Sequence, residues 1–538
     1  MQDEADEERN VIPRWRPLRG IEKADLASIR PASPEGFERN LARLNDEVRL
    51  WQNDSGIVAA ADLFDAYLIT GDRRQLRQAI SALKSDRQNI PDRLRSAFLS
   101  AFRTDESPLD WRAKIAANET DENFVRQSIR LFKRQILEYP RDGLLHVEIA
   151  RLYTVIGSYH KAEYHLNIAI ILYPNNRYIL RSMMQFYDTV GDLYQGLKNV
   201  RKSGLLKFDP WIQSAEVAAA TNLGKSSVVA SHKLIRLDSN GNVARHSSEL
   251  AMAMATLDRL HGVKERKVFQ LVRNALPHAT ENGFAQAVWL SNRSTREFAA
   301  RFPEAHPSED AYEARVKISM KERDFPAAAK NAEMWLKDQP FSVDALITYL
   351  NLRSIHVGPD EASLLYAKRA IHVHGDNWHV MNACVLVFAE AGDFESSRLA
   401  LGRMERQANS EGISAFLAAA RGFLAFAEGN FVAGRGFYEE AIRLGRAAKS
   451  NYLIVDALIF WFRAEALSGL LTNEFIEQTS EIIDRSLLRI QQTEKSFLND
   501  VWFSVKQRIA SRSNIDREKN YDAIAANVAA YIEDPLLL

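Results

Sequence analysis

The stretch LLHVEIARLYTVIGSYHKAEYHLNIAIILYPNN, Leu144 to Asn176, contains two segments of helical periodicity separated by one glycine. The first segment carries an apolar stripe that includes Ile149, Ala150 and Tyr153. Gly157 can take the left-handed conformation that ends a helix. Ala162 and Ala169 lie seven residues apart in the second segment, so they share a face where two helices can approach closely. Pro174 cannot continue a helix, and the stretch therefore predicts one antiparallel helix hairpin.

The same features return at a nearly constant spacing. Pro140 and Pro174 are 34 residues apart, and so are Gly157 and Gly191. A second series of turn residues follows downstream, with separations of 35, 34 and 37 residues: Arg323-Asp324, Gly358, Gly392-Asp393 and Gly429-Asn430. Periods of this length are typical of stacked structural repeats. The sequence therefore predicts an all-α fold, an α-solenoid of antiparallel helix hairpins.

Six positions of the first hairpin resemble the signature of the tetratricopeptide repeat (TPR) family: Ala150, Tyr153, Gly157, Ala162, Ala169 and Pro174. The resemblance covers residues 120–210 and 310–445, about 40% of the chain, and rests on periodicity elsewhere. It implies a TPR-like superhelix whose first helices line a concave groove for another polypeptide. By the same resemblance, the chain is expected to be a non-enzymatic scaffold, adaptor or regulatory subunit.

Among the residues of this chain that match the family's groove positions, we expect seven to contact a partner: Glu148, Arg151, Tyr178, Arg181, Gln185, Asn351 and Asn382. The set of lysines and asparagines that grips a C-terminal carboxylate in some members is incomplete here. Arg151 and Arg181 can still hold an acidic group, because a guanidinium offers a bidentate fork. The expected partner is a protein or peptide, an acidic one included.

Composition predicts the organisation of the chain. Pro277, Gly283, Pro303 and Pro307 interrupt the repeat pattern, and the N-terminus mixes acidic residues with prolines. The predicted regions are a flexible N-terminal tail at 1–33, an N-terminal array at 34–275, a junction at 276–309 and a C-terminal array with a capping helix at 310–538.

Length and composition exclude several classes of protein. A chain of 538 residues is too long for one ordinary globule, and a single cysteine excludes a disulfide framework or a thiolate zinc cluster. The charge is balanced, with 70 Lys+Arg against 70 Asp+Glu. The acidic start has no secretory character, and the most apolar stretch, 452–462, is shorter than the roughly 20 residues that cross a bilayer. We expect a cytoplasmic protein with no membrane association.

Two local patterns resemble ligand sites but depart from them at the decisive positions. Gly224 to Ser227 reads GKSS, like the end of a phosphate-binding loop, but Ala219 stands where that loop needs its first glycine. A calcium-loop spacing runs from Asp238 to Glu249, with Val243 where the sharp turn needs glycine. A turn with a serine cap and a polar loop explain these residues better.

The histidines and the cysteine also give little indication of a metal site or a catalytic site. A local cluster contains His356, His372, His374 and His379, but its spacing matches no zinc motif. Cys384 falls at a core position of a first helix, which favours a buried structural thiol. No catalytic, cofactor-binding or metal-binding residue is predicted, and no cofactor is expected.

Two alternative functions stay open. The repeat signature fades over residues 211–310, where a ligand-sensing or catalytic site has room. Residues 151–275 contain 17 Lys+Arg and 9 Asp+Glu, a balance of 17 − 9 = +8, which can attract nucleic acid. Because these basic residues are dispersed and lack interleaved aromatic residues, nucleic acid is the less favoured partner. The oligomeric state is left open.

Overall fold

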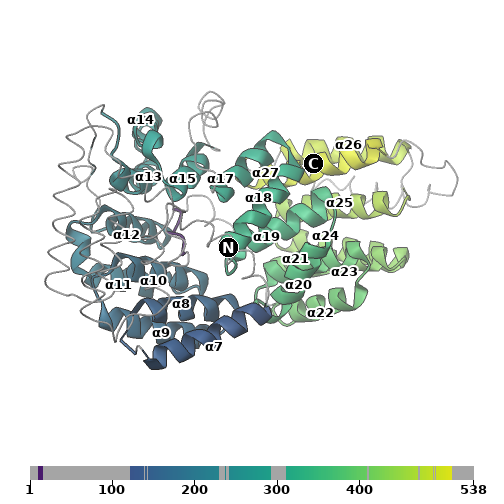
Figure 1. Ribbon diagram of the computed structural model, residues 1–538. Helices are drawn as coiled ribbons and strands as arrows, with labels where there is room; N and C mark the ends of the chain where they lie inside the picture. Colours follow the sequence, from purple (N-terminus) through teal and green to yellow (C-terminus); the bar gives the residue numbers. More distant parts are fainter. Residues whose placement is uncertain are drawn as a thin grey trace, which may run out of the picture. The chain divides into compact units, whose positions relative to one another are not determined.

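A computed structural model describes residues 10–15, 122–138, 140–141, 143–229, 235, 237, 241–291, 311–408, 411–470, 473–488, 490 and 492–511. Within these ranges the regular elements are helices, which confirms the predicted all-α class (Figure 1). None of the described helices is both long and apolar enough to cross a membrane. The predicted capping helix, the first part of the N-terminal array and most of the predicted tail lie outside the described residues.

Contacts divide the chain into two compact units. Unit 1 comprises residues 1–318 and 334–342, and unit 2 comprises residues 319–333 and 343–538. The predicted junction at 276–309 falls within unit 1, and its described part contains the short helix η5, Leu276–His278, and the regular helix α15, Glu281–Ser291.

The described helices of unit 1 follow one another along the chain in this order: α7 (Glu122–Glu138), α8 (Gly143–Val155), α9 (Tyr159–Leu172), α10 (Arg177–Thr189), α11 (Leu193–Lys202), η3 (Gly204–Lys207), α12 (Pro210–Asn222), α13 (Arg245–Leu260), α14 (Glu265–Ala275), η5 (Leu276–His278) and α15. Residues 312–318 of α17 (Tyr312–Glu322) and 334–338 of α18 (Phe325–Asp338) also belong to unit 1. The first helices α8, α10 and α12 pack on one another in order, and α13 packs on α12 and on α15. We call α8, α10, α12, α13 and α15 the first-helix layer of unit 1.

Local sequence explains the hairpins of unit 1. Gly157 and Gly191 take positive φ angles of 72° and 78° at the turns after α8 and α10. Ala162 and Ala169 are fully buried on α9, which packs against α8, as their spacing predicts. The side chain of Asn176 accepts a hydrogen bond from the Ile179 N–H and so starts α10.

The repeat becomes irregular after α12, because residues 223–229 are not helical and the next described helix is α13. Glu216 on α12 is buried and binds Arg201, with 2.7 Å between Arg201 Nη2 and Glu216 Oε1. The same carboxylate accepts hydrogen bonds from the Ser227 hydroxyl and the Val228 N–H. This buried carboxylate therefore fixes residues 227–228 against α12. The Val243 N–H donates to the Asn274 carbonyl of α14.

The helices of unit 2 comprise the remaining parts of α17 and α18 and the following elements: α19 (Val343–Asn351), η7 (Leu352–Val357), α20 (Glu361–Val373), α21 (Trp378–Ala391), α22 (Phe394–Glu405), α23 (Glu411–Ala427), α24 (Phe431–Ala447), α25 (Asn451–Leu467), α26 (Asn473–Leu488) and α27 (Gln492–Ser511). The first helices α19, α21, α23, α25 and α27 contact one another in succession. Gly392 and Gly429 end α21 and α23 with positive φ, as their sequence period predicts.

Unit 2 has one irregular helix, because α19 continues into the π-helical η7. A wider helical turn leaves backbone carbonyls that need other donors. Arg463 of α25 donates to the Ser354 carbonyl within η7 and forms an ion pair with Glu390 at 2.7 Å. Its guanidinium also lies over the Phe423 ring. The almost fully buried arginine thus joins η7, α21, α23 and α25.

Candidate functional site

Residues 10–15, Asn10-Val-Ile-Pro-Arg-Trp15, belong to unit 1 and pack against its helices, although more than 100 residues separate them from α7; we call them the N-segment. The N-segment is neither helix nor strand and runs between α12 and α15 (Figure 1, purple). Asn10 is 1% exposed and Trp15 is fully buried. This part of the predicted flexible tail is therefore packed, and the first-helix layer forms the surface beneath it.

Three side-chain amides of unit 1 bind the main chain of the N-segment. Asn222 Oδ1 accepts from the Asn10 N–H at 2.6 Å, and Asn222 Nδ2 donates to the Asn10 carbonyl at 2.9 Å. Gln286 Oε1 accepts from the Val11 N–H at 2.5 Å. Gln339 Oε1 accepts from the Trp15 N–H at 3.3 Å. We call Asn222, Gln286 and Gln339 the amide clamp.

Other hydrogen bonds orient the clamp. Gln286 Nε2 donates to the Thr256 hydroxyl at 2.8 Å, which directs its oxygen towards the N-segment. Gln339 Nε2 donates to the Asp338 carbonyl at 2.9 Å, with the same effect. A glutamine has one acceptor and one donor end, so engaging the donor end fixes which end faces the ligand. Gln286 and Gln339 are thus set to accept from peptide N–H groups.

Apolar side chains of the N-segment enter two different clusters of unit 1. Ile12 belongs to a cluster built mainly by α10, α11 and α12, whose members include Leu180, Met184, Ile212 and Ala215. Trp15 belongs to the cluster built by α7 to α10 and packs against Phe341, with 5.6 Å between ring centroids. Both side chains therefore have apolar surroundings within unit 1.

Arg14 lies in an acidic site. Its Nη1 is 3.3 Å from Glu281 Oε2, and its Nη2 is 3.7 Å from Glu313 Oε2. The side chains of Arg14, Glu281 and Glu313 are 6%, 3% and 11% exposed. Charges removed from water to this degree need close opposite charges. The two carboxylates therefore form a site for a cation.

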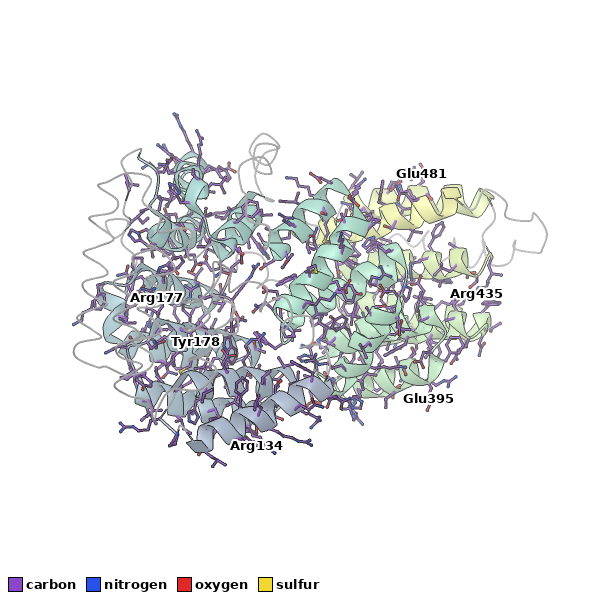
Figure 2. The ribbon with its side chains drawn as sticks, in the orientation of Figure 1. Arg134, Arg177, Tyr178, Glu395, Arg435 and Glu481 are labelled. Atoms are coloured by element: carbon purple, nitrogen blue, oxygen red, sulfur yellow. The ribbon has the colours of Figure 1, made fainter. Side chains whose placement is uncertain are left out.

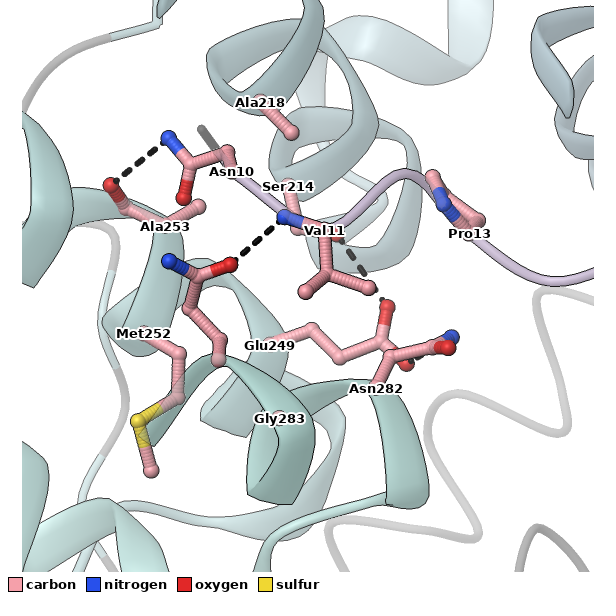
Figure 3. A pocket seen from close by; sticks show the side chains of 11 residues that line it. Asn10, Val11, Pro13, Ser214, Ala218, Glu249, Met252, Ala253, Asn282 and Gly283 are labelled. Atoms are coloured by element: carbon pink, nitrogen blue, oxygen red, sulfur yellow. Dashed lines mark hydrogen bonds between the residues drawn. The ribbon is translucent and has the colours of Figure 1, made fainter. Parts of the chain in front are cut away.

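A buried carboxylate also lines the pocket beneath Val11 and Pro13 (Figure 3). Glu249 on α13 forms an ion pair with Arg181 at 2.9 Å and accepts hydrogen bonds from Thr280 at 2.8 Å and Asn282 at 3.1 Å. Burial acts to raise the pKa of Glu249, but the charge and hydrogen bonds of Arg181 and the other donors outweigh it and lower the pKa. Glu249 is therefore an ionised structural hub beneath the N-segment.

Three of the seven sequence-predicted contact residues come together next to Trp15. Tyr178 lies on α10 of unit 1 (Figure 2). Its hydroxyl donates to Glu148 Oε1 at 2.9 Å. Burial, and then the charge and hydrogen bond of Glu148, hold the pKa of Tyr178 well above its ordinary value, while Arg151 acts in the opposite direction. Tyr178 also packs against the cluster that contains Trp15. Arg151 itself is only 1% exposed, so its guanidinium does not face solvent.

The other four predicted residues lie apart from this group. Arg181 is engaged by Glu249 and stacks over Trp211, with 5.4 Å from its guanidinium carbon to the ring centroid. Gln185 is half-buried on α10, while Asn351 and Asn382 are half-buried on α19 and α21 of unit 2. The role of all seven as partner contacts remains a prediction.

Sequence reasoning missed the residues that hold the N-segment. Asn222, Gln286 and Gln339 are single amides in different helices or turns, and no local motif distinguishes them. The N-segment itself carried a signal, because VIPRW is an apolar and aromatic run inside an otherwise charged N-terminus. That signal indicates a buried segment but not the surface that buries it.

The remaining sequence candidates have structural contacts. Lys225 of the GKSS turn lies 3.6 Å from the centroid of the Tyr194 ring, and Ser227 binds Glu216. His356 stacks on Phe325 and bonds to Ser504, with 2.5 Å between His356 Nδ1 and the hydroxyl. Asp238 and Asn240 of the calcium-like pattern lie outside the described residues.

Metal and thiol chemistry have little support in the described ranges. No group of three or more His, Cys, Asp or Glu residues there is arranged to hold a metal ion. Burial lowers the pKa of His374 to about 4, with a further contribution from Arg369. Cys384 is fully buried, and burial raises the pKa of its thiol. It therefore has the environment of the structural thiol that the sequence predicts.

Comparison with known proteins places no family name on the chain. No family model matches it, and no curated protein matches it. Among solved structures, the crystal structure of yeast Tom70 is similar over 78% of this chain and 99% of that chain, with 12% sequence identity and a TM-score of 0.26. These values are too low to transfer a function.

Proposed function

We propose that the chain is a non-enzymatic scaffold, adaptor or regulatory subunit whose unit 1 binds a non-helical segment of a partner polypeptide. The observation that carries this proposal is the paired hydrogen bond between Asn222 and the main chain of Asn10. Asn222 and Gln286 thus bind the main chain of consecutive residues, Asn10 and Val11. A surface that already holds one such segment has the chemistry to hold another.

Main-chain recognition suits a polypeptide ligand. A chain outside helices and sheets leaves its N–H and C=O groups unpaired, and each must find a partner when it is buried. Side-chain amides supply both a donor and an acceptor without regard to the bound sequence. The apolar clusters around Ile12 and Trp15 then supply selectivity.

The same surface weighs against the alternative functions. Glu249, Glu281 and Glu313 lie beneath or beside the N-segment, and buried carboxylates repel phosphate groups. Nucleic acid therefore finds no favourable site here, although residues 151–275 are basic overall. The degenerate region 211–310 supplies α12, α13 and α15 to the surface, which favours a role in polypeptide binding. The cytoplasm stays the expected location.

Selection from a library of random dodecapeptides displayed on phage tests the proposal. The full chain is the bait, and the affinities of selected peptides are then measured for the Arg14→Glu chain, in which Glu281 and Glu313 repel the N-segment, with and without the double substitution Asn222→Ala, Gln286→Ala. We expect the double variant to lose at least about tenfold in affinity, because main-chain hydrogen bonds are removed. The control is Arg398→Ala, which breaks an exposed ion pair in unit 2. Peptides that bind the double variant undiminished would place the binding surface elsewhere.

A further inference from the structure

We infer that the N-segment is an internal substitute for the partner's segment, and that the partner displaces it. The partner segment accordingly carries a cation followed directly by a large aromatic residue, as Arg14-Trp15 does. This inference rests on the proposed function, since it requires that the surface binds peptides. It adds the chemical class of the ligand. It also adds that the N-segment occupies the surface until the partner binds.

The aromatic position is the deepest contact of the N-segment. Trp15 is fully buried, within a cluster formed by α7 to α10 and Phe341. A single indole buries more apolar surface than other side chains, and such anchors dominate peptide affinity. Trp15 is also the only aromatic residue of the N-segment. A partner that lacks an aromatic residue here would leave an apolar site unfilled.

The preceding position selects positive charge. Glu281 and Glu313 approach the Arg14 guanidinium from two elements, at the start of α15 and in the first turn of α17. Lys317 neutralises part of this charge, since its Nζ lies 3.6 Å from Glu313 Oε1. An acidic residue at this position would place a third carboxylate in a nearly dry site, which is strongly unfavourable. The surface thus favours a basic partner segment, whereas the sequence analysis included an acidic partner.

The contacts of the N-segment also allow a partner segment to replace it. Its main chain is bound through side-chain amides, so its release breaks no backbone hydrogen bond within a helix. The fit is incomplete, because a pocket remains beneath Val11 and Pro13. In addition, the buried side-chain oxygen of Asn10 has no hydrogen-bond partner among the described residues. A partner segment that fills the pocket and satisfies its own polar atoms can bind more tightly than the N-segment does.

Displacement can be followed directly by hydrogen exchange on the full chain. The probe is a synthetic peptide EERNVIPRWRPL, the sequence of residues 7–18, labelled with heavy isotopes so that its fragments differ in mass from those of the chain. At saturating peptide, we expect the amide groups of residues 10–15 of the chain to exchange faster. The fragments that cover α12 and α15 should stay protected, because the peptide replaces the N-segment on them.

The competition between the N-segment and the peptide can be measured with variants that release the N-segment, which we call opening variants. Arg14→Glu in the chain sets a carboxylate against Glu281 and Glu313, which should release the N-segment and strengthen peptide binding by at least about tenfold. Val11→Pro provides a second opening variant, since it removes the N–H that donates to Gln286 and the Val11 side chain, and it alters no residue of the helices. Arg398→Glu, in an exposed ion pair of unit 2, is the matched charge reversal that should change nothing. Thermal unfolding checks that each variant is folded.

Changes in the peptide test the ligand class. Replacing its arginine before tryptophan by glutamate, or that tryptophan by alanine, should each reduce affinity for Val11→Pro by at least about tenfold. If these altered peptides bind as well as the original, or if the N-segment stays protected at saturation, the inference is wrong while peptide binding itself stands. If neither the probe nor any library peptide binds the wild type or the opening variants, the proposed function fails with it.

Discussion

Asn222 holds both main-chain polar groups of Asn10, accepting from the N–H at 2.6 Å and donating to the carbonyl at 2.9 Å. The two residues are separated by 212 positions in the sequence. One side-chain amide thus does for a single residue what a neighbouring β-strand does for alternate residues. This contact sets the register of the N-segment on unit 1.

Asn222→Ala should loosen the N-segment without unfolding unit 1. Two hydrogen bonds are lost, and the Asn10 groups left behind are nearly buried, so we expect local opening to become easier by about 1–3 kcal/mol. Hydrogen exchange at residues 10–15 should accelerate by about tenfold or more. Gln407→Ala is the control, because it removes a side-chain hydrogen bond to the Gly375 carbonyl in unit 2. Equal exchange in wild type and Asn222→Ala would show that the clamp contributes little.

Arg463→Ala should destabilise unit 2 strongly. The variant removes the Arg463 guanidinium from its ion pair with Glu390 and from its hydrogen bond to the Ser354 carbonyl of η7. Loss of one partner from a buried ion pair costs about 3–5 kcal/mol. Arg398→Ala breaks an exposed ion pair with Glu428 and should cost at most about 1 kcal/mol. Thermal unfolding compares the two, and similar melting temperatures would contradict the role assigned to Arg463.

Two glycines of α24 should respond oppositely to the same substitution. A Cβ on Gly434 would lie 2.5 Å from the Phe426 ring and 3.3 Å from the Gly422 carbonyl oxygen, whereas a Cβ on Gly436 meets nothing within 4 Å. Gly434→Ala should therefore destabilise the α23–α24 hairpin by about 1–3 kcal/mol. Gly436→Ala should stabilise it by up to about 1 kcal/mol, since alanine is the better helix former. Urea unfolding measures the change in the free energy of unfolding for both variants. A Gly434→Ala variant as stable as the wild type would contradict the close packing of Gly434 against Phe426.

Asp456 should make unit 2 less stable as the pH rises. Burial on α25 raises the pKa of its carboxyl from 3.8 to about 7. Between these values the unfolded chain has released the proton and the folded chain retains it, so stability falls as the pH rises through this window. At pH 8, Asp456→Asn should be more stable than wild type, by on the order of 1–4 kcal/mol, and below pH ~4 the difference should vanish.

Melting temperatures measured across this pH range check the prediction for Asp456. Asp376→Asn is the matched control, because it removes a carboxylate from an exposed position of the same unit. Its curve should run parallel to that of the wild type. A constant difference between Asp456→Asn and wild type at every pH would mean that Asp456 does not titrate in this window.

Some residues of the binding surface could be predicted from the sequence. Tyr178 and Glu148 follow from the repeat register, and they lie beside the cluster that buries Trp15. Arg181 follows from the same register, but its engagement with Glu249 does not, because 68 residues separate the two. A register predicts on which helix a side chain lies, whereas its partner depends on which helices stack.

The sequence by itself determined the helix hairpins. Turn glycines such as Gly157 and Gly392, and small residues such as Ala162, act within one or two helices, so their spacing is sufficient to predict the local fold. Only the tertiary structure decided that Asn10 binds Asn222. The same holds for Arg14, which lies close to Glu281 and Glu313. Contacts across more than 200 residues have no sequence period, because they arise only when distant helices stack and bring single side chains together.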